Sequence, residues 1–291
     1  MKKTIWLAAA AATLLGSGVY AHDHGTAKGK DSAAHAQMHK AHQQRIAQIL
    51  ADPSRAEDAK RDKYRHPAET LEFFRVHPDH KIGEYAPGGE WVSRLLGRYV
   101  EGPGKLVGLY FKPAGFADPK RQEGIKAGAA SYAADVAKVT GRPATDYSAF
   151  TLGDIPEGQK GTFDRILIMR MMHNINRWNI ADSELKAMRE LLKDDGLVGI
   201  EQHRAKADAP YSYTDGGKGY MREADVIKMM EINGFELVGK SEVNANPKDS
   251  ADWPDGVWTL PPVLAKKDVD RAKYEAIGET DRMTLLFKKR L

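Results

Sequence analysis

Short apolar runs alternate with stretches of helical periodicity over most of this chain. The runs have the length and the content of β-branched and aromatic residues that are typical of strands. They cover residues 81–85, 106–111, 146–152, 164–169, 197–201, 235–243 and 283–287. Strands that alternate with helices favour parallel βαβ units. We therefore predict an α/β fold with a Rossmann-like, doubly wound sheet.

Apolar residues at helical spacing lie between these runs. Pro67 opens a short predicted helix that presents Leu71, Phe73 and Phe74. Residues 91–100 and 185–192 have the pattern of crossover helices, and the second is expected to stop at a glycine cap at Gly196. Residues 226–232 form a third such pattern, which ends at Asn233-Gly234.

The N-terminal part has a different composition. Residues 1–21 have the pattern of a signal peptide: two lysines, an apolar run, and a small-residue exit ending at Ala21. A membrane anchor is the alternative, but the run is shorter than the roughly 20 residues that a spanning helix needs. Residues 22–65 are interpreted as a His/Ala-rich tail and helical extension, with a solvated helix over 54–65, and residues 66–291 as the α/β domain. We expect a periplasmic or secreted protein with no membrane span after signal cleavage.

Composition narrows the classes of function. Removing residues 1–21 takes Lys+Arg from 44 to 42 against 40 Asp+Glu, which leaves a net charge of about +2. No stripe of basic residues with interleaved aromatics is present, so nucleic acid is not an expected partner. The absence of cysteine excludes disulfides, thiolate metal ligands and a cysteine nucleophile.

The segment Lys81-Ile-Gly-Glu-Tyr-Ala-Pro-Gly-Gly-Glu-Trp91 combines a strand ending in an acid, a small-residue turn and an amphipathic helix. Glycines let a ligand approach the backbone, and the helix N-terminus offers unpaired N–H groups. A carboxylate at the end of the strand, Glu84, can accept hydrogen bonds from hydroxyl or ammonium groups. The alternative is an ordinary tight turn, because a Gly-rich turn alone is weak evidence.

Glu84 to Trp91 resembles the first motif of the class I S-adenosylmethionine-dependent methyltransferases, in an exported and largely uncharacterised bacterial branch. That branch is similar to this chain at further segments: 66–74 (HPAETLEFF), 164–174, 199–204 (GIEQHR) and 281–288. The resemblance implies a seven-stranded sheet in the order 3-2-1-4-5-7-6 with strand seven antiparallel. It also implies S-adenosylmethionine bound over the carboxyl ends of strands one, two and four.

Two departures from the family pattern concern the cofactor site. Where the wider family favours Gly-x-Gly-x-Gly, this chain has Ala86-Pro-Gly-Gly-Glu90, so that only Gly88 is in register. The wider family also places an acid at the end of strand two, where this chain has Tyr110-Phe-Lys112. Glu84 or Asp154 takes the role of that acid, or the affinity for the cofactor is weak or absent. The expected cofactor-binding residues are Glu84, Ala86, Pro87, Gly88, Gly89, Asp154, Arg170 and Asn174.

Polar residues follow the next two strands of the sheet. Arg170, His173 and Asn174 come directly after the apolar run 166–169, where histidine can serve as a general base. The alternative is that Arg170 and His173 only cap the strand. Glu201 and His203 end the fifth strand at the same edge, and His173, Glu201 and His203 are our candidate catalytic residues. Arg204 is a cation for an acidic substrate. Two histidines and a carboxylate could instead hold a metal, although their spacing does not indicate one.

Three remaining segments each have two interpretations. The loop 210–220 is aromatic and rich in glycine, and could close as a lid. In the loop 246–266, Trp253 and Trp258 could stack on a flat acceptor, although aromatic residues in long loops more often pin the loop to the body. The tail contains His22, His24, His35, His39 and His42, which indicates either metal binding or a solvated tail.

Taken together, the sequence predicts an exported S-adenosylmethionine-dependent methyltransferase that acts on a small-molecule or unknown acceptor. The export signal argues against this function, because S-adenosylmethionine is made in the cytoplasm. The alternative is a non-catalytic periplasmic protein that uses a methyltransferase fold to bind a small ligand or a partner. Metal binding through the His-rich tail would be an addition to either.

Overall fold

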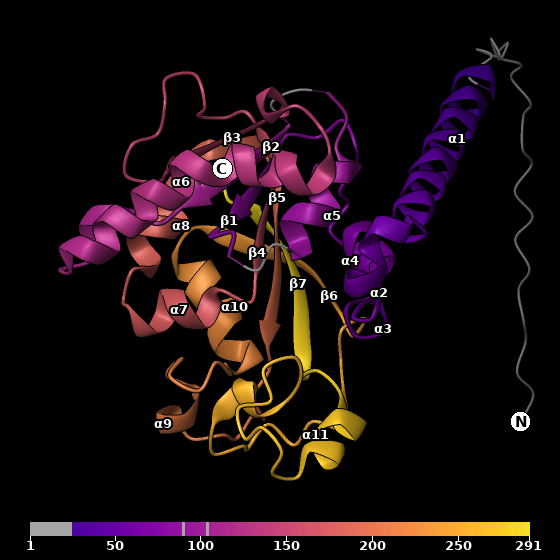
Figure 1. The fold of residues 1–291 in the computed structure, drawn as a ribbon. Helices are drawn as coiled ribbons and strands as arrows, with labels where there is room; N and C mark the ends of the chain where they lie inside the picture. Colours follow the sequence, from indigo (N-terminus) through magenta and orange to yellow (C-terminus); the bar gives the residue numbers. More distant parts are fainter. Residues whose placement is uncertain (1–24, 89–90, 103–104) are drawn as a thin grey trace, which may run out of the picture. The chain divides into compact units, whose positions relative to one another are not determined.

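The computed structural model describes residues 25–88, 91–102 and 105–291 (Figure 1). The predicted signal peptide, His22 and His24 lie outside the described residues. One compact unit, residues 42–291, carries the sheet. Within the described residues no helix is long and apolar enough to cross a bilayer.

The strands of the sheet agree with the predicted runs to within a few residues. Their bounds are β1 (Ile82–Tyr85), β2 (Leu106–Tyr110), β3 (Tyr147–Thr151), β4 (Phe163–Met169), β5 (Leu192–His203), β6 (Phe235–Ser241) and β7 (Arg282–Lys289). The order β3-β2-β1-β4-β5-β7-β6, with β7 antiparallel to both neighbours, is confirmed. The carboxyl ends of β1, β2 and β4 therefore share one edge of the sheet.

Helices and short 3-10 turns connect the strands. Their bounds are α1 (Gly25–Leu50), η1 (Pro53–Arg55), α2 (Ala56–Ala59), α3 (Asp62–Arg65), α4 (Pro67–Phe73), α5 (Trp91–Tyr99), η2 (Pro113–Gly115), α6 (Pro119–Thr140), η3 (Ala144–Asp146), α7 (Met172–Arg177), α8 (Ala181–Leu191), α9 (Tyr211–Thr214), α10 (Glu223–Ile232), η4 (Gly256–Thr259) and α11 (Arg271–Ile277). The predicted glycine cap at Gly196 is wrong. Helix α8 ends at Leu191, and β5 begins at the next residue and runs through Gly196.

Alternating side chains of the strands build two apolar layers. Ile166 and Ile168 of β4 face a cluster that includes α7, α8 and α10, whereas Leu167 faces a cluster that includes α4 and α5. A strand that is buried on both faces needs a continuous apolar run, as the sequence has here. On the second face Phe74 packs directly on Gly199, where an added Cβ would lie 2.6 Å from the phenylalanine ring.

The expected solvated helix over residues 54–65 is wrong. The segment is broken into η1, α2 and α3, and three of its charged side chains are buried: Arg55, Asp58 and Arg65. Arg94 of α5 donates to Asp58 at 2.6 and 2.8 Å, and Arg65 pairs with Glu279 at 3.1 Å. Charge alone does not indicate exposure when every buried charge has a partner.

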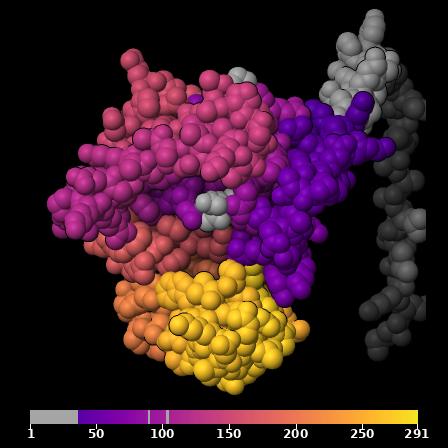
Figure 2. All heavy atoms as spheres, viewed as in Figure 1, coloured from indigo at the N-terminus to yellow at the C-terminus, as the bar shows by residue number. Residues whose placement is uncertain are grey.

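The segment between β6 and β7 contains the short elements η4 and α11 and forms the yellow part of the surface in Figure 2. Trp253 is held in it by a hydrogen bond from Nε1 to Asp249 (2.7 Å) and by edge contact with Tyr274. Trp258 packs on the same small cluster as Trp253. The two tryptophans therefore hold the loop against the body of the protein, which was the preferred of the two interpretations of the sequence.

Candidate functional site

A cavity of about 590 Å³ lies at the carboxyl ends of β1, β2 and β4. Its wall is formed by residues 84–88 at the end of β1, 110–111 at the end of β2 and 169–171 at the end of β4, together with residues of α5 and α6. This volume is in the range of small-molecule sites, and the position is the usual one for ligands of doubly wound sheets. The turn after β1, which the sequence predicted as a ligand-binding segment, therefore lines this cavity.

The turn after β1 has the backbone conformation that glycine favours. Ala86 has a φ of +49°, and its N–H donates to Leu109 at 2.7 Å. Among the described residues, an added Cβ at Gly88 would meet only the carbonyl oxygen of Ala86, at 3.7 Å, which leaves room for a ligand there. Pro87 and Gly88 line the cavity, and Gly89 lies outside the described residues. The turn leaves room for a ligand beside its backbone.

Glu84 is a buried carboxyl group on the cavity wall. The hydroxyl of Ser93 donates to both of its oxygens, at 2.8 and 2.9 Å, and that of Tyr132 donates at 3.0 Å. Burial raises the pKa of Glu84 to about 7, although both hydrogen bonds oppose the shift. Glu84 is therefore able to change its charge near neutral pH.

The residues after β2 and β3 do not supply a second carboxylate to the cavity. Tyr110 stands at the end of β2 and makes an edge contact with Tyr132, with ring centroids 6.2 Å apart. Asp154 is exposed in the turn after β3, and the described residues that line the cavity do not include it. Glu84 is thus the carboxylate that the described part of the chain places on the cavity wall.

Arg170 connects the cavity to the fifth strand. It has a φ of +57°, its N–H donates to the carbonyl of Glu201 at 2.6 Å, and its guanidinium donates to the Glu201 carboxylate at 3.2 and 3.3 Å. Arg170 is also one of the residues that line the cavity. A positive φ outside glycine is strained, and the hydrogen bonds to Glu201 hold Arg170 in this conformation.

Glu201, one of the candidate catalytic residues, belongs to a buried network of ion pairs in which its partners are arginines. Arg282 pairs with it at 3.1 Å and also with Glu279 at 2.9 Å. Burial raises the pKa of Glu201, but Arg282, Arg170 and Arg65 together outweigh that effect and lower it. A carboxylate held by two arginines has little capacity left for a metal ion.

His173 and His203 lie together, with ring centroids 6.1 Å apart, but each has a neutral partner. His173 Nδ1 lies 3.4 Å from the side-chain oxygen of Gln202, and His203 Nδ1 lies 2.6 Å from the hydroxyl of Thr280. Burial lowers the pKa of His173 to about 4 and that of His203 well below its usual range. The two histidines, which were expected to act as general bases at neutral pH, are therefore weak bases. Neither of them is among the described residues that line the cavity.

Asn174 stands behind the cavity wall. Its amide donates to the sulfur of Met171 at 3.4 Å, and Met171 lines the cavity. Its side-chain oxygen is buried and has no hydrogen-bond partner among the described residues. A buried acceptor without a partner costs free energy, so this oxygen is available to a donor that enters beside Met171.

The predicted lid, residues 210–220, is packed against the domain. Gln202 donates to the carbonyl of Gly219 at 2.7 Å, and Asn176 donates to the carbonyl of Asp215 at 2.7 Å. At Gly216 an added Cβ would lie 2.3 Å from the carbonyl oxygen of His173. The loop covers His173 in this structure.

Arg204, the expected cation for a substrate, instead pairs with Asp281 (2.8 Å) and Glu242 (2.7 Å).

Helix α6, which brings further residues to the cavity, was not among the helices predicted from the sequence. Arg121 lines the cavity and lies over the rings of Phe116 and Trp178, at 3.9 and 3.7 Å from their centroids. The signal was present: Asp118 caps the helix, Pro119 opens it and Gly141 ends it in the left-handed conformation. The weak apolar periodicity of this alanine-rich helix hides it from a search for amphipathic patterns.

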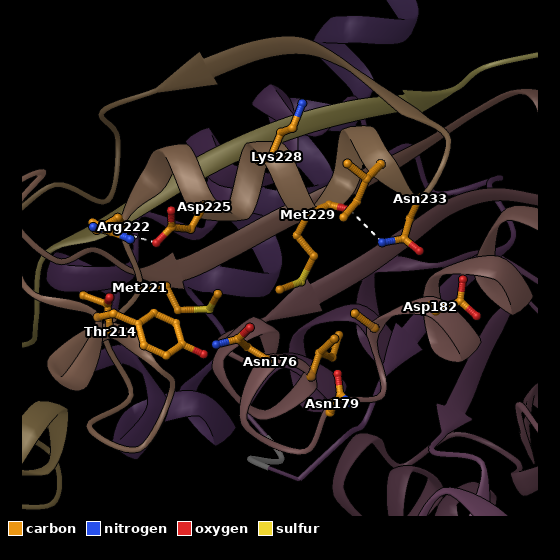
Figure 3. A pocket seen from close by; sticks show the side chains of 14 residues that line it. Asn176, Asn179, Asp182, Thr214, Met221, Arg222, Asp225, Lys228, Met229 and Asn233 are labelled. Atoms are coloured by element: carbon orange, nitrogen blue, oxygen red, sulfur yellow. Dashed lines mark hydrogen bonds and ion pairs between the residues drawn. The ribbon is translucent and has the colours of Figure 1, made fainter.

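A second cavity, of about 520 Å³, is bounded by α7, α8, α9 and α10 (Figure 3). Asn176, Asp182 and Lys228 are among the polar groups on its wall, and Arg222 donates to Asp225 at 2.7 Å. Its wall consists of helices and loops and includes none of the predicted site residues. We therefore place the candidate site in the first cavity.

No family model matches this sequence, and no curated protein matches it. Among solved structures, the fold is similar to that of the [4+2]-cyclase SpnF, with a TM-score of 0.51 at 16% identity over 83% of this chain and 86% of that chain. A geranyl diphosphate methyltransferase in complex with SAM has a TM-score of 0.43 at 11% identity, over 84% of this chain and 94% of that chain.

The strand order, the antiparallel seventh strand and the likeness to the [4+2]-cyclase SpnF define the fold. It is Rossmann-like and of the class I methyltransferase type. At 16% identity the likeness concerns the fold alone, because one fold supports many activities. The function has to be argued from the cavity.

Proposed function

We propose that this protein is an exported S-adenosylmethionine-dependent methyltransferase that acts on a small-molecule acceptor. One observation carries the proposal: the open turn at Gly88 and the carboxyl group of Glu84 lie on one cavity of about 590 Å³, at the strand ends where this fold binds ligands. The predicted signal peptide in residues 1–21 is the reason for proposing a periplasmic or secreted location.

The groups on the cavity wall fit the cofactor in part. An adenosine needs apolar walls and a hydroxyl acceptor, for which Phe111, Ile125 and Glu84 are present. The carboxylate of a methionine moiety needs a cation, for which Arg170 and Arg121 are present. The cofactor, when bound, supplies an electrophilic methyl group.

The residues of this chain would contribute binding and orientation more than proton transfer. His173 is buried and its pKa is about 4, so it is a poor base at neutral pH. Glu84, whose pKa is about 7, is the titratable group on the cavity wall that is poised near neutrality. Because Glu84 is assigned to the hydroxyl groups of the adenosine, we expect an acceptor that is already nucleophilic at neutral pH.

The proposal is tested by calorimetric titration of residues 22–291 with S-adenosylmethionine and S-adenosylhomocysteine. Gly88→Phe places a ring in the cavity without backbone strain, and we expect it to abolish micromolar binding. Gly88→Ala is the matched control, because within the described part of the chain its Cβ meets only an oxygen at 3.7 Å, and it should bind within a few-fold of the wild type. No binding by the folded wild type, or equal binding by Gly88→Phe, would refute the cofactor site.

Tyr110 at the end of β2 favours a second function, that of a non-catalytic protein that binds another small ligand. A hydroxyl-binding carboxylate is absent there, and Glu84 already accepts from Ser93 and Tyr132. The variant Tyr110→Asp distinguishes the two functions. In a methyltransferase limited by the missing acid it should bind S-adenosylmethionine more tightly, whereas in a protein adapted to another ligand the cofactor should remain unbound.

A further inference from the structure

His42, His77 and Asp79 form a cluster away from the cavity. Each offers one ligand atom, and these atoms all lie within 4.8 Å of one another. His42 belongs to the last part of α1, whereas His77 and Asp79 belong to the turn between α4 and β1. We propose that this cluster binds a divalent transition-metal ion of the zinc type.

The end of α1 is held in place beside the turn. Arg45, one turn of helix after His42, donates to the carbonyls of Tyr99 (2.6 Å) and Arg98 (3.1 Å) at the end of α5. A cation is favourable at the C-terminus of a helix, where carbonyl groups lack partners. Ile46 is buried in the apolar cluster on the same side. Because residues three and four positions apart share one helix face, His42 lies on the anchored face.

The turn that carries His77 and Asp79 is attached to the end of α5, which also holds the end of α1. The hydroxyl of Tyr99 donates to the carbonyl of Val76 at 3.2 Å, and the N–H of Glu101 donates to the carbonyl of Pro78 at 2.7 Å. The ring of His80 stacks on that of His77, with centroids 4.6 Å apart. Two segments distant in sequence are therefore fixed to one site at the end of α5, which is the arrangement that a metal centre needs.

The chemistry of the three ligands selects the kind of ion. Two imidazoles and one carboxylate suit zinc, copper or nickel, whereas calcium and magnesium prefer sites made of oxygen atoms. With metal–ligand bonds of about 2.1 Å, the ligand atoms of a tetrahedral site lie roughly 3.4 Å apart. The side chains would close by at most about 1.4 Å from their 4.8 Å limit, and partly exposed side chains have the freedom to do so. A fourth position is left for water.

The His-rich tail could also bind metal, so the experiment has to separate the two places. Residues 22–291 are freed of metal with a chelator and titrated with Zn²⁺ by calorimetry, with no other ligand present. Three single variants remove the cluster: His42→Ala, His77→Ala and Asp79→Asn. The matched control replaces His22, His24 and His35 with alanine and leaves the cluster intact.

We expect the wild type and the control to bind one Zn²⁺ with the same affinity, and each cluster variant to bind at least ten-fold more weakly. Zn²⁺ should also raise the thermal unfolding midpoint of the wild type and the control but not that of the cluster variants, whose midpoints without metal show that they are folded. Co²⁺ in place of Zn²⁺ should give the visible absorption bands of a low-coordinate site in the wild type and in the control, but not in the three cluster variants. No saturable binding by the wild type, unchanged binding by the cluster variants, or loss of binding in the control would overturn the proposal.

Discussion

Glu84→Gln should make the protein more stable at alkaline pH, because the native fold buries this carboxyl group. Burial raises its pKa from 4.5 to about 7. A native pKa above the unfolded one means that the native state binds the proton more tightly. The stability from Glu84 is therefore fully present below pH 4.5 and is lost as the pH rises through 7.

The magnitude follows from the same two values. At about 1.4 kcal/mol for each pKa unit, the difference corresponds to about 3 kcal/mol over the whole range. About 2.5 kcal/mol of it falls between pH 5 and pH 8.5, since part is already lost at pH 5. Glutamine keeps a neutral hydrogen-bonding group between Ser93 and Tyr132 and does not titrate.

Urea unfolding of the wild type and Glu84→Gln at pH 5 and pH 8.5 measures this effect. The free energy of unfolding of the variant, relative to the wild type, should rise by about 2.5 kcal/mol between the two pH values. Glu123→Gln removes an exposed carboxylate from α6 and serves as the control, for which the difference should stay nearly constant. A difference for Glu84→Gln that does not change with pH would refute the reasoning.

Three further substitutions test the packing around the site, each by urea unfolding. Gly199→Ala should lower the free energy of unfolding by about 1–3 kcal/mol, because its Cβ would lie 2.6 Å from the ring of Phe74; an unchanged midpoint would contradict this contact. Arg282→Met should cost about 3–5 kcal/mol by leaving Glu201 short of a buried partner, and a loss below 1 kcal/mol would contradict the network. Ala86→Gly should raise stability by about 0.5–1 kcal/mol, since it removes the strain of a φ of +49°, whereas a lower stability would show that the strain is absent.

The sequence by itself was enough for the strands and most crossover helices, because the signals that define them are local. The apolar run 166–169 and the alternation of strands and helices depend on neighbouring residues only, and family resemblance supplied the strand order. Helix α6 was not predicted, because its many alanines give only a weak periodic pattern of apolar residues. Its capping residues, Asp118 and Gly141, can nevertheless be recognised in the sequence.

The environment of each polar side chain was decided by the tertiary structure alone. Glu201 and His203 do end one strand, as the sequence predicted, but their partners Arg282 and Thr280 come from residues about 80 positions away. Burial, which depends on all the elements that pack around a group, lowers the pKa of His173 and raises that of Glu84. A sequence places titratable groups at a sheet edge, but their charge depends on desolvation and on partners that only the folded chain brings together.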